Sequence, residues 1–417
     1  MAHETSAPGF INRTSLASGA AVARDYDYYR DIFRGQPMPF AFVDLDLLQE
    51  NVALTLHRSQ RKLIRLATKS LRSVAIIRRI LDASPQFQGL MCFTAREAVH
   101  LARLGFTDLL VGYPAVSETD ILDVAHATAS GASITLMVDS IEHVERIAVI
   151  AQKVGAQIPL CLEVDMSLPL PGLRFGVLRS PIRTADDAQP ILERILLESA
   201  VRLDGIMGYE AQIAGLGDRV PGQAAKNALI WALKRRSAAD VALRRAAIVD
   251  LANKLGCAPR FVNGGGTGSM RTTGQERGVT EITVGSGFFA PGLFDLYREF
   301  RYLPAAGYAI EIVRRPAPGI FTCLGGGYIA SGATSAEKAP VVHLPAGARL
   351  DHNEGAGEVQ TPIHYAGPSE LSLGDPVFLR HSKAGELCER FNHLLLVSNG
   401  AVVDTVTTYR GDGLCFL

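Results

Sequence analysis

Lys69 is the first residue of the chain whose type and position could support chemistry. The apolar run of residues 64–68 before it is typical of a short strand, and parallel strands carry their reactive side chains at their carboxyl ends. A lysine amine at such a place can form a Schiff base with a carbonyl compound, provided that burial beside other cations keeps part of it neutral. Judged alone, a lysine at a strand end is more often an ordinary surface residue, so Lys69 needs support from the rest of the chain.

A glycine-rich segment, residues 263–269, directly follows another strand-like run and could bind an anion. Its glycines let the backbone approach a phosphate closely, successive amides can form an anion-binding nest, and Thr267 and Ser269 add hydroxyl donors. A second glycine turn at residues 285–287 could complete the site, because the loops after the last strands of a parallel barrel often bind phosphate. The segment has neither the lysine of a nucleoside-triphosphate loop nor the acidic partner of a dinucleotide site. It therefore predicts a phosphate site, with a flexible turn as the alternative.

A third group near the predicted ends of later strands comprises Arg174, Tyr209, Glu210 and Gln212. An arginine there can hold a carboxylate or a phenolic oxygen by charge-assisted hydrogen bonds, and a tyrosine can pack against a pyridine ring. Each also has an ordinary explanation, because Arg174 could form a loop salt bridge and Tyr209 could belong to the core. A lysine early in the chain and a glycine turn late in it, both at strand ends, are hard to attribute to chance. We therefore expect one shared site.

The segments that must position these residues alternate between short apolar runs and longer amphipathic stretches. This alternation predicts parallel strands joined by right-handed helical crossovers, and about eight such units favour a closed (β/α)8 barrel over an open, doubly wound sheet. The strand-like runs are residues 40–43, 64–68, 89–93, 108–111, 133–138, 159–164, 203–209, 260–263 and 281–284. The helix-like stretches include residues 24–33, 46–57, 73–83, 95–104, 141–154 and 224–254.

After residue 296 the pattern changes to short apolar runs broken by glycine, proline and asparagine, which predicts a mostly antiparallel β domain. The dipeptide Asn399-Gly400 between two of these runs favours a tight hairpin turn. We therefore expect an N-terminal arm of residues 1–38, a barrel of residues 39–296 and a C-terminal β domain of residues 297–417.

The composition excludes several classes of function. The 417 residues are 47% hydrophobic and 20% charged with a formal net charge of zero, so no excess of charge is present to gather nucleic acid or an anionic membrane. A small-molecule partner is therefore expected. No run approaches the roughly 18 apolar residues of a membrane helix, and the start of the chain lacks the pattern of a secretory signal, which predicts a cytoplasmic location. The six cysteines are scattered and form no CxxC pair, which argues against a disulfide framework or a structural zinc site.

Five segments between Pro39 and Arg410 carry a resemblance to a known enzyme family. They are residues 40–46 (FAFVDLD), 67–70 (ATKS), 93–98 (FTAREA), 208–210 (GYE) and 264–268 (GGGTG). In this order they resemble the D-threonine aldolase and D-serine dehydratase family, which belongs to the alanine racemase-like, fold-type III pyridoxal-phosphate enzymes. The resemblance implies a barrel followed by a β domain, assembly as a homodimer, and pyridoxal 5'-phosphate as the cofactor.

The resemblance also implies a role for each candidate residue. Lys69 would be the catalytic residue and would carry the cofactor as a Schiff base, while the side chains of Arg174 and Tyr209 would contact the cofactor ring. Gln212 stands where several relatives have histidine, so its part in substrate or metal handling stays open. The residues expected to hold the cofactor phosphate are Gly265, Gly266, Thr267, Gly285 and Ser286.

A divalent metal in the β domain is the second property of this family, bound by a histidine and by a cysteine or aspartate two residues later, with an asparagine just beyond. The matching stretch contains His381, Glu386, Cys388 and Asn392, but the histidine lies seven residues before the cysteine. The resemblance implies a metal held by His381 and Cys388, with Glu386 as an alternative ligand. Thiolate and imidazole suit zinc, whereas carboxylate ligands suit manganese or magnesium. The alternative is a metal-free hairpin with a buried Cys388.

The function implied is that of a pyridoxal-phosphate lyase acting on β-hydroxy D-amino acids, as in D-threonine aldolase, with retro-aldol cleavage to glycine and an aldehyde. Elimination to a 2-oxo acid and ammonia, as in D-serine dehydratase, is the first alternative. A racemase is the second, and it would need another base such as Tyr328 or Tyr365 from a partner subunit. A non-catalytic protein that binds pyridoxal phosphate is an alternative of a different class.

Overall fold

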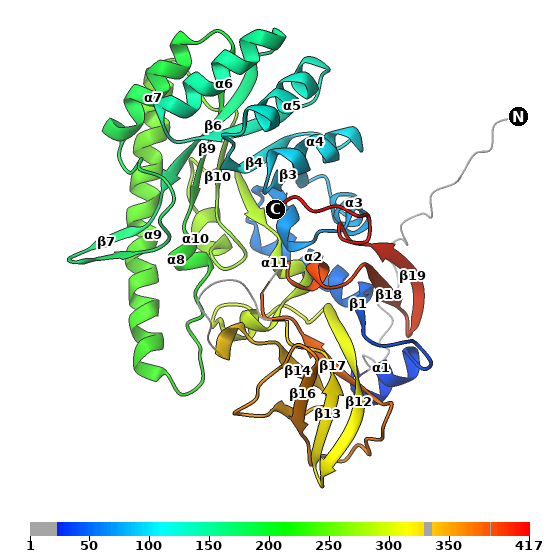
Figure 1. Cartoon of the computed structure of the whole chain (residues 1–417). Helices are drawn as coiled ribbons and strands as arrows, with labels where there is room; N and C mark the ends of the chain where they lie inside the picture. Colours follow the sequence, from blue (N-terminus) through cyan, green and yellow to red (C-terminus); the bar gives the residue numbers. More distant parts are fainter. Residues whose placement is uncertain (1–22, 329–335, 384) are drawn as a thin grey trace, which may run out of the picture.

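An eight-stranded parallel barrel forms the larger part of the computed structural model, which describes residues 23–328, 336–383 and 385–417 (Figure 1). Hydrogen bonds between β11 and β2 close the barrel, with Ile282 opposite Ile64. The predicted (β/α)8 barrel is thus confirmed, and the open sheet is wrong. The barrel strands, in spatial order, are β2 (Leu63–Ala67), β3 (Phe87–Cys92), β4 (Leu109–Pro114), β5 (Ile134–Val138), β6 (Ile158–Asp165), β9 (Val201–Tyr209), β10 (Phe261–Gly264) and β11 (Glu281–Val284).

Helices cover the outside of the barrel, and most of them start at a polar cap. The Thr94 side chain accepts a hydrogen bond from the Glu97 amide, and Thr184 and Asp187 form a capping box. Such caps satisfy amides that the helix itself cannot pair. The main helices are α2 (Leu45–Arg58), α3 (Val74–Leu81), α4 (Ala95–Arg103), α5 (Glu118–Ala129), α6 (Ile141–Val154), α7 (Ala185–Leu197) and α9 (Ala224–Lys254). Shorter ones are α8 (Ala211–Ala214), α10 (Met270–Gly274) and α11 (Ser286–Phe289), and the predicted helix of the arm is α1 (Tyr26–Ile32).

A buried ionic network lies inside the barrel and involves residues in or directly before β2, β4 and β11. Arg65 is fully buried, and its Nε donates to Glu281 Oε1 at 2.7 Å while its Nη2 donates to Asp108 Oδ2 at 2.9 Å. Asn263 Nδ2 also donates to Glu281 Oε1 at 2.7 Å. A buried charge is tolerated when it is paired and hydrogen-bonded in this way. The charge of Arg65 is therefore compensated inside the barrel.

The second sheet is mostly antiparallel, as predicted, but it includes a strand from the start of the chain. Strand β1 (Phe40–Asp44) pairs antiparallel with β12 and parallel with β18, and all five of its residues are buried. The sequence places this run first in the barrel series, and its apolar pattern alone cannot tell which sheet it joins. The predicted domain limits stay a prediction. The other strands are β12 (Ala306–Ala317), β13 (Ile320–Leu324), β14 (Val341–Leu344), β15 (Arg349–Leu350), β16 (Gln360–His364), β17 (Pro376–Arg380), β18 (His393–Ser398) and β19 (Ala401–Thr407).

The predicted hairpin between β18 and β19 is present. Asn399 and Gly400 have φ angles of 50° and 79°, so both adopt the left-handed conformation that a tight turn of this kind requires. In the described part of the chain, no helix is both long enough and apolar enough to cross a membrane.

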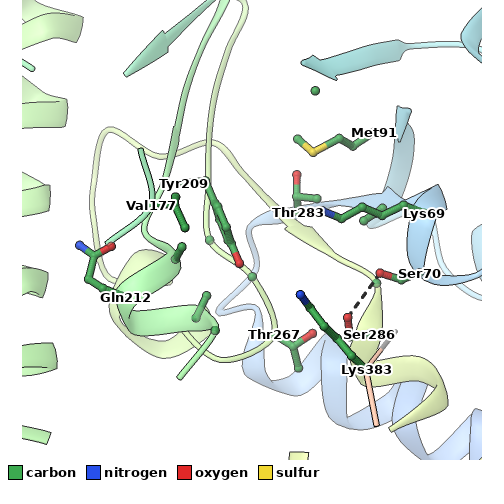
Figure 2. Close-up of a pocket in the computed structure, with 18 of the residues that line it drawn as sticks. Lys69, Ser70, Met91, Val177, Tyr209, Gln212, Thr267, Thr283, Ser286 and Lys383 are labelled. Atoms are coloured by element: carbon green, nitrogen blue, oxygen red, sulfur yellow. Dashed lines mark hydrogen bonds between the residues drawn. The ribbon is translucent and has the colours of Figure 1, made fainter. Parts of the chain in front are cut away.

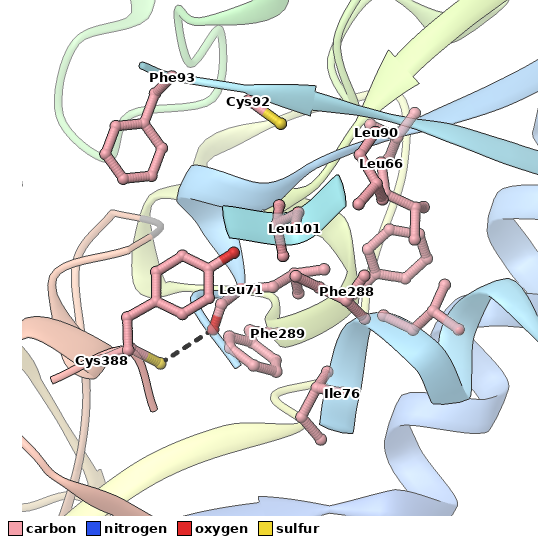
Figure 3. Close-up of a cluster of buried hydrophobic side chains, with 14 of the residues drawn as sticks. Leu66, Leu71, Ile76, Leu90, Cys92, Phe93, Leu101, Phe288, Phe289 and Cys388 are labelled. Carbon is pink, nitrogen blue, oxygen red and sulfur yellow. Dashed lines mark hydrogen bonds between the residues drawn. The ribbon is translucent and has the colours of Figure 1, made fainter. Parts of the chain in front are cut away.

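The connection between β17 and β18 and the segment after β19 pack against the turn that carries Lys69. Gly385 has a φ of 93°, and a Cβ atom there would collide with the Lys69 carbonyl oxygen. The Tyr409 amide donates to the Arg72 carbonyl at 2.8 Å, and Cys388 Sγ donates to the Leu71 carbonyl at 3.1 Å. Figure 3 shows Cys388 beside Leu71 in the apolar cluster that contains Phe288 and Phe289. The C-terminal segments therefore fix the backbone at one edge of the barrel mouth.

Candidate active site

A cavity of about 590 Å³ opens where the barrel strands end, and it contains every residue predicted to bind the cofactor. Figure 2 shows Lys69, Tyr209 and Lys383 pointing into it from different sides. Gln212 also lines it. The eight predicted residues in its wall are Lys69, Arg174, Tyr209, Gly265, Gly266, Thr267, Gly285 and Ser286.

Lys69 lies in the short 3-10 helix η1 (Thr68–Ser70) directly after β2. Its Nζ donates to the hydroxyl of Tyr113, near the end of β4, at 3.2 Å. Burial acts to raise the pKa of Tyr113, but the charges of Lys69 and Arg179 and the hydrogen bonds from them outweigh it and bring this pKa below its ordinary value. The phenol of Tyr113 is therefore more acidic than that of a free tyrosine.

Arg179 is the arginine that lies between the aromatic residues of the cavity. Its guanidinium carbon lies 4.9 Å from the ring centroid of Tyr113 and 5.8 Å from that of Tyr209. Its side chain is fixed by an ion pair with Glu163 and by a 3.0 Å hydrogen bond to the Gly112 carbonyl. Arg174, the predicted arginine, lies on the hairpin of β7 (Leu168–Leu170) and β8 (Leu173–Phe175), where its side chain is 44% exposed. Arg174 thus stands at the edge of the cavity and Arg179 inside it.

The glycine turns after β10 and β11 approach other parts of the chain too closely for side chains. Gly265 has a φ of 82°, and a Cβ atom there would lie 2.7 Å from Ile282 Cγ2. A Cβ atom at Gly285 would lie 2.7 Å from Ser70 Oγ. The hydroxyl oxygens of Ser70 and Ser286 are 3.3 Å apart, so hydroxyl groups from two strand ends meet beside the turn. Backbone amides and hydroxyls in a cradle of this kind suit a phosphate group.

Glu210 supports the first glycine turn from below. This carboxylate is buried, and it accepts hydrogen bonds from the Gly265 amide at 3.2 Å and from Ser269 Oγ at 2.9 Å. Arg245 Nη2 compensates its charge at 3.0 Å. Ser269, which the sequence suggested as an anion donor, is therefore turned toward Glu210. The Gly266 amide donates to Ser269 Oγ at 3.1 Å, and Gly266 and Thr267 are the neighbouring residues of this turn that line the cavity.

Tyr209 and Gln212 form the wall opposite Lys69. Burial, together with the charge of Glu210, raises the pKa of Tyr209 to about 12, so the phenol stays protonated. A Cβ atom at Gly266 would lie 3.3 Å from the Tyr209 ring, which places the ring beside the glycine turn. Gln212 Nε2 donates to the Met166 carbonyl at 2.6 Å and is held by the barrel wall.

The predicted metal ligands are not assembled into a metal site. His381 is buried with neither ring nitrogen hydrogen-bonded to any described residue, and burial and Arg380 lower its pKa to about 3. The thiol of Cys388 donates to the Leu71 carbonyl at 3.1 Å, and burial raises its pKa to about 12. Among the described residues, no group of three or more His, Cys, Asp or Glu side chains is placed to hold an ion. Within the described ranges, His381 and Cys388 therefore do not form a site for a divalent metal.

The two tyrosines considered as racemase bases lie in the second sheet and its loops. Tyr365 is buried, and its hydroxyl accepts a hydrogen bond from the Ser369 amide at 3.1 Å. The Tyr328 ring packs against Tyr308 and Phe391, with centroid distances of 5.0 and 5.6 Å. Neither tyrosine lines the cavity of its own chain within the described residues.

Besides Arg179, the residues of the cavity wall that sequence reasoning missed include Tyr113, Lys338 and Lys383. Tyr113 follows a predicted strand by two residues, and that position was a usable signal. Lys383 lies in the sequence between the two predicted metal ligands, and the metal motif assigns it no role. Lys338 lies in a short turn, η3 (Ala336–Lys338), that has no sequence signal.

A family model and several known proteins match this chain. The model described as alanine racemase, N-terminal domain, matches residues 43–284. The 3-hydroxy-D-aspartate aldolase of Paracoccus denitrificans (strain Pd 1222) is 24% identical over 257 residues, which are 60% of this chain and 59% of that protein. The D-threo-3-hydroxyaspartate dehydratase of Delftia sp. (strain HT23) is 28% identical over 177 residues, which are 41% of this chain and 43% of that protein. The chain thus spans only about three fifths, at 59%, of the length of the first of these curated relatives.

Solved structures show the same fold over nearly the whole chain. D-threonine aldolase from Filomicrobium marinum superimposes with a TM-score of 0.76 at 17% identity, covering 91% of this chain and 96% of that one. The Delftia dehydratase gives a TM-score of 0.70 at 20% identity, covering 90% and 98%. Both likenesses cover at least 90% of this chain, whereas the family model ends at residue 284.

Proposed function

The chain belongs to the family whose model is described as alanine racemase, N-terminal domain, and on this basis we propose that it is a pyridoxal-phosphate-dependent lyase of β-hydroxy D-amino acids. Its main reaction would be retro-aldol cleavage to glycine and an aldehyde. The names of the relatives support this choice, since one is a 3-hydroxy-D-aspartate aldolase and another a D-threonine aldolase.

One observation carries the proposal. The predicted cofactor lysine, the glycine turns and the tyrosine come from positions up to about half the chain apart, yet all line a single cavity at the carboxyl ends of the strands. A barrel of this type has its reactive groups at that end. Lys69 would bind the carbonyl carbon of the cofactor, Gly266, Thr267 and Ser286 would hold its phosphate, and Tyr209 would lie against its ring. When bound, the cofactor would accept the electron pair released at Cα of an amino acid.

Tyr113 would prepare Lys69 for this task. A lysine binds a carbonyl compound only as a neutral amine, and the ammonium form must first lose a proton. The hydroxyl of Tyr113 already accepts a hydrogen bond from Lys69 Nζ, and its lowered pKa makes the phenolate more accessible than in a free tyrosine. Arg179 stabilises that phenolate through its charge.

Elimination is the second candidate reaction. The Delftia protein is named a dehydratase, and it has the same fold over 90% of this chain. A β-hydroxy D-amino acid would then lose its hydroxyl and yield a 2-oxo acid and ammonia. A divalent metal is not part of either proposal, since His381 and Cys388 do not form a metal site with the other described residues.

The deciding experiment is a product analysis with the cofactor-loaded protein. D-threonine is expected to give glycine and acetaldehyde, and the formation of 2-oxobutanoate and ammonia would instead identify a dehydratase. L-threonine serves as the stereochemical control, and Lys69→Ala as the control for the cofactor. A protein that binds the cofactor but converts no D-β-hydroxy amino acid would be a carrier and would contradict the proposal.

A homodimer is also proposed. Val177 and Leu178 lie on the loop beside the cavity and are 40% and 79% exposed, an apolar rim that a second subunit would cover. Light scattering of the purified protein gives the mass directly, and a monomeric mass at working concentration would contradict the dimer.

A further inference from the structure

The glycine turns of the cavity are held from behind by one face of helix α2. This helix packs against α11, which follows the second glycine turn (Figure 1). Three polar residues of α2, namely Asn51, Thr55 and Arg58, have the spacing of a single helical face. Asn51 Nδ2 donates to the Phe288 carbonyl at 3.0 Å, and Thr55 Oγ1 lies 3.1 Å from the hydroxyl of Tyr302. This face of α2 is therefore bonded to the chain on both sides of the second turn.

Arg58, the last residue of α2, contacts the first glycine turn. Its Nη1 donates to the Thr267 carbonyl at 3.1 Å and to the Tyr302 hydroxyl at 3.2 Å. Its guanidinium carbon lies 4.2 Å from the ring centroid of Phe300. Stacking on a ring and hydrogen bonds to two oxygens together fix the plane of a guanidinium group. Arg58 is thus held against the side of Thr267 that faces α2.

No acidic residue compensates the charge of Arg58 within residues 23–328, 336–383 and 385–417. The side chain is half-buried and forms no ion pair in these ranges, and its Nη2 is shielded from solvent without a hydrogen-bond acceptor there. Arg65 and Arg245 differ, because each pairs with a buried carboxylate. A shielded cation without a counter-ion is costly unless an anion binds near it. The charge of Arg58 is therefore available to an anion at the turn.

The hydrogen bond from Arg58 also orients a peptide group of the first turn. In a planar trans peptide, the carbonyl of one residue and the N–H of the next point in opposite directions. Since the Thr267 carbonyl points to Arg58, the Gly268 amide points away from α2. The Thr267 and Gly268 amides donate to no other residue that the structure describes, whereas the two preceding amides already donate to side chains. The free amides of this turn thus flank the residue that Arg58 holds.

Thr267 also connects the two glycine turns. Its Oγ1 accepts a hydrogen bond from the Gly287 amide at 3.2 Å, and a Cβ atom at Gly287 would lie only 2.8 Å from Thr267 Cγ2. Thr267 lines the cavity from the first turn, and Ser286 lines it from the second. A displacement of Thr267 would therefore alter both turns. By fixing Thr267, Arg58 influences the geometry of the whole anion site.

We propose that Arg58 is a positioning residue for the phosphate of the cofactor, and that its uncompensated charge strengthens the binding of that group. This inference rests on the proposed function. Arg58 acts through Thr267, since it is not one of the residues that line the cavity. Its charge favours a phosphate monoester over a ligand of the same shape without the phosphate, because only the charged group gains from a nearby cation. Because α2 directly follows β1, this support is continuous with the second sheet.

The test compares the binding of pyridoxal phosphate with that of pyridoxal, the same compound without its phosphate. In Arg58→Met the Kd for pyridoxal phosphate should rise by about 10-fold, while the Kd for pyridoxal should change little. A general loosening of the fold would weaken both compounds alike. Arg78→Met is the matched control and should change neither Kd. Arg78 stacks at 4.4 Å on the Phe106 ring and donates to the Leu104 carbonyl at 2.6 Å, and neither partner lines the cavity.

Two more variants separate the charge of Arg58 from its hydrogen bonds. Arg58→Lys keeps the charge and should retain most of the preference for pyridoxal phosphate. Arg58→Gln keeps an amide donor for the Thr267 carbonyl but has no charge, so it should lose most of that preference. Inorganic phosphate, measured by its competition with pyridoxal phosphate for the apoprotein, should follow the same order. These two variants also provide the comparison if Arg58→Met does not fold.

The outcomes distinguish this inference from the proposed function. If the folded variants without the charge have the same ratio of the two Kd values as the wild type, the role of Arg58 is overturned and the proposed function stands. If the wild-type protein binds pyridoxal as tightly as pyridoxal phosphate, or binds neither compound, the phosphate site is overturned. The proposed function and this inference would then fail together.

Discussion

The side-chain nitrogen of Lys69 lies 3.2 Å from the hydroxyl of Tyr113, across the mouth of the barrel from one strand end to another. Neither residue is buried on its own, and 42% of Tyr113 is exposed, yet both belong to the wall of one cavity. The Arg179 guanidinium lies over the same tyrosine ring. The pair therefore links the candidate nucleophile to a phenol whose pKa lies below its ordinary value.

Replacing Tyr113 with phenylalanine is expected to slow cofactor capture and lower kcat by about 10²-fold, because Lys69 loses its proton acceptor. The capture rate follows from the growth of visible absorbance after cofactor is added to the apoprotein. Tyr328→Phe removes a hydroxyl from a ring packed outside the cavity and is the matched control. Equal capture rates for Tyr113→Phe and the wild type would show that Tyr113 has no part in activating Lys69.

Gly285→Ala should weaken cofactor binding and lower the free energy of unfolding by about 1–3 kcal/mol, since the new methyl group cannot be accommodated without movement. It would lie 2.7 Å from Ser70 Oγ and 2.8 Å from the Ala67 carbonyl oxygen. Titration with pyridoxal phosphate and urea unfolding measure the two effects. Gly278→Ala is the control, because no atom lies within 4 Å of its added Cβ. Wild-type affinity in Gly285→Ala would remove this turn from the phosphate site.

The parts of the site that could be predicted from sequence are those in which local chemistry carries the signal. Two local patterns were sufficient to predict site residues. One is a lysine directly after an apolar run, and the other is a run of glycines before Thr267. Tyr113 and Arg179 meet only in the folded barrel, where Tyr113 lies in β4 and Arg179 lies on the segment that follows β8. No local pattern encodes that encounter.

The fold shows the same division between local and long-range information. The alternation of strands and helices was sufficient for the barrel, because each unit is a local pattern that repeats. The strand at Phe40 has the same pattern but pairs with β12 and β18, more than 250 residues away. The sequence of the strand does not indicate which distant strands it pairs with. Cys388 is a similar case, since its contact with Leu71 spans 317 residues. The position of Cys388 therefore depends on long-range packing, which the local metal motif does not encode.

The ion pair of Arg65 with Glu281 is expected to matter for stability rather than for catalysis. Arg65→Met should lower the free energy of unfolding by about 3–5 kcal/mol, because it leaves the buried carboxylate without its cation. The double variant Arg65→Met with Glu281→Gln should recover part of this loss. Urea unfolding of the three proteins gives the comparison. A single variant as stable as the wild type would show that the barrel interior admits water at this point.

Glu97 makes the stability of the barrel rim depend on pH. The residue is fully buried, and burial raises its pKa to about 7 from an ordinary value of 4.5, although hydrogen bonds from the Phe93 amide and the Tyr409 hydroxyl oppose the shift. Between these two pH values the folded protein keeps a proton that the unfolded chain has released. Its contribution to stability is therefore complete below the unfolded pKa and is lost as the pH rises through the folded one.

Glu97→Gln should flatten this dependence, because an amide does not titrate. In the wild type the free energy of unfolding should fall by up to about 1.4 kcal/mol for each pH unit within that window, and in the variant this slope should be smaller. Urea unfolding at several pH values measures it, with Glu118→Gln on the exposed end of α5 as the control. Since Glu97 connects Tyr409 of the C-terminal segment to the loop of Phe93, which lines the cavity, cofactor affinity in the wild type should weaken over the same pH range. Identical slopes in Glu97→Gln and the wild type would contradict a buried, protonated Glu97.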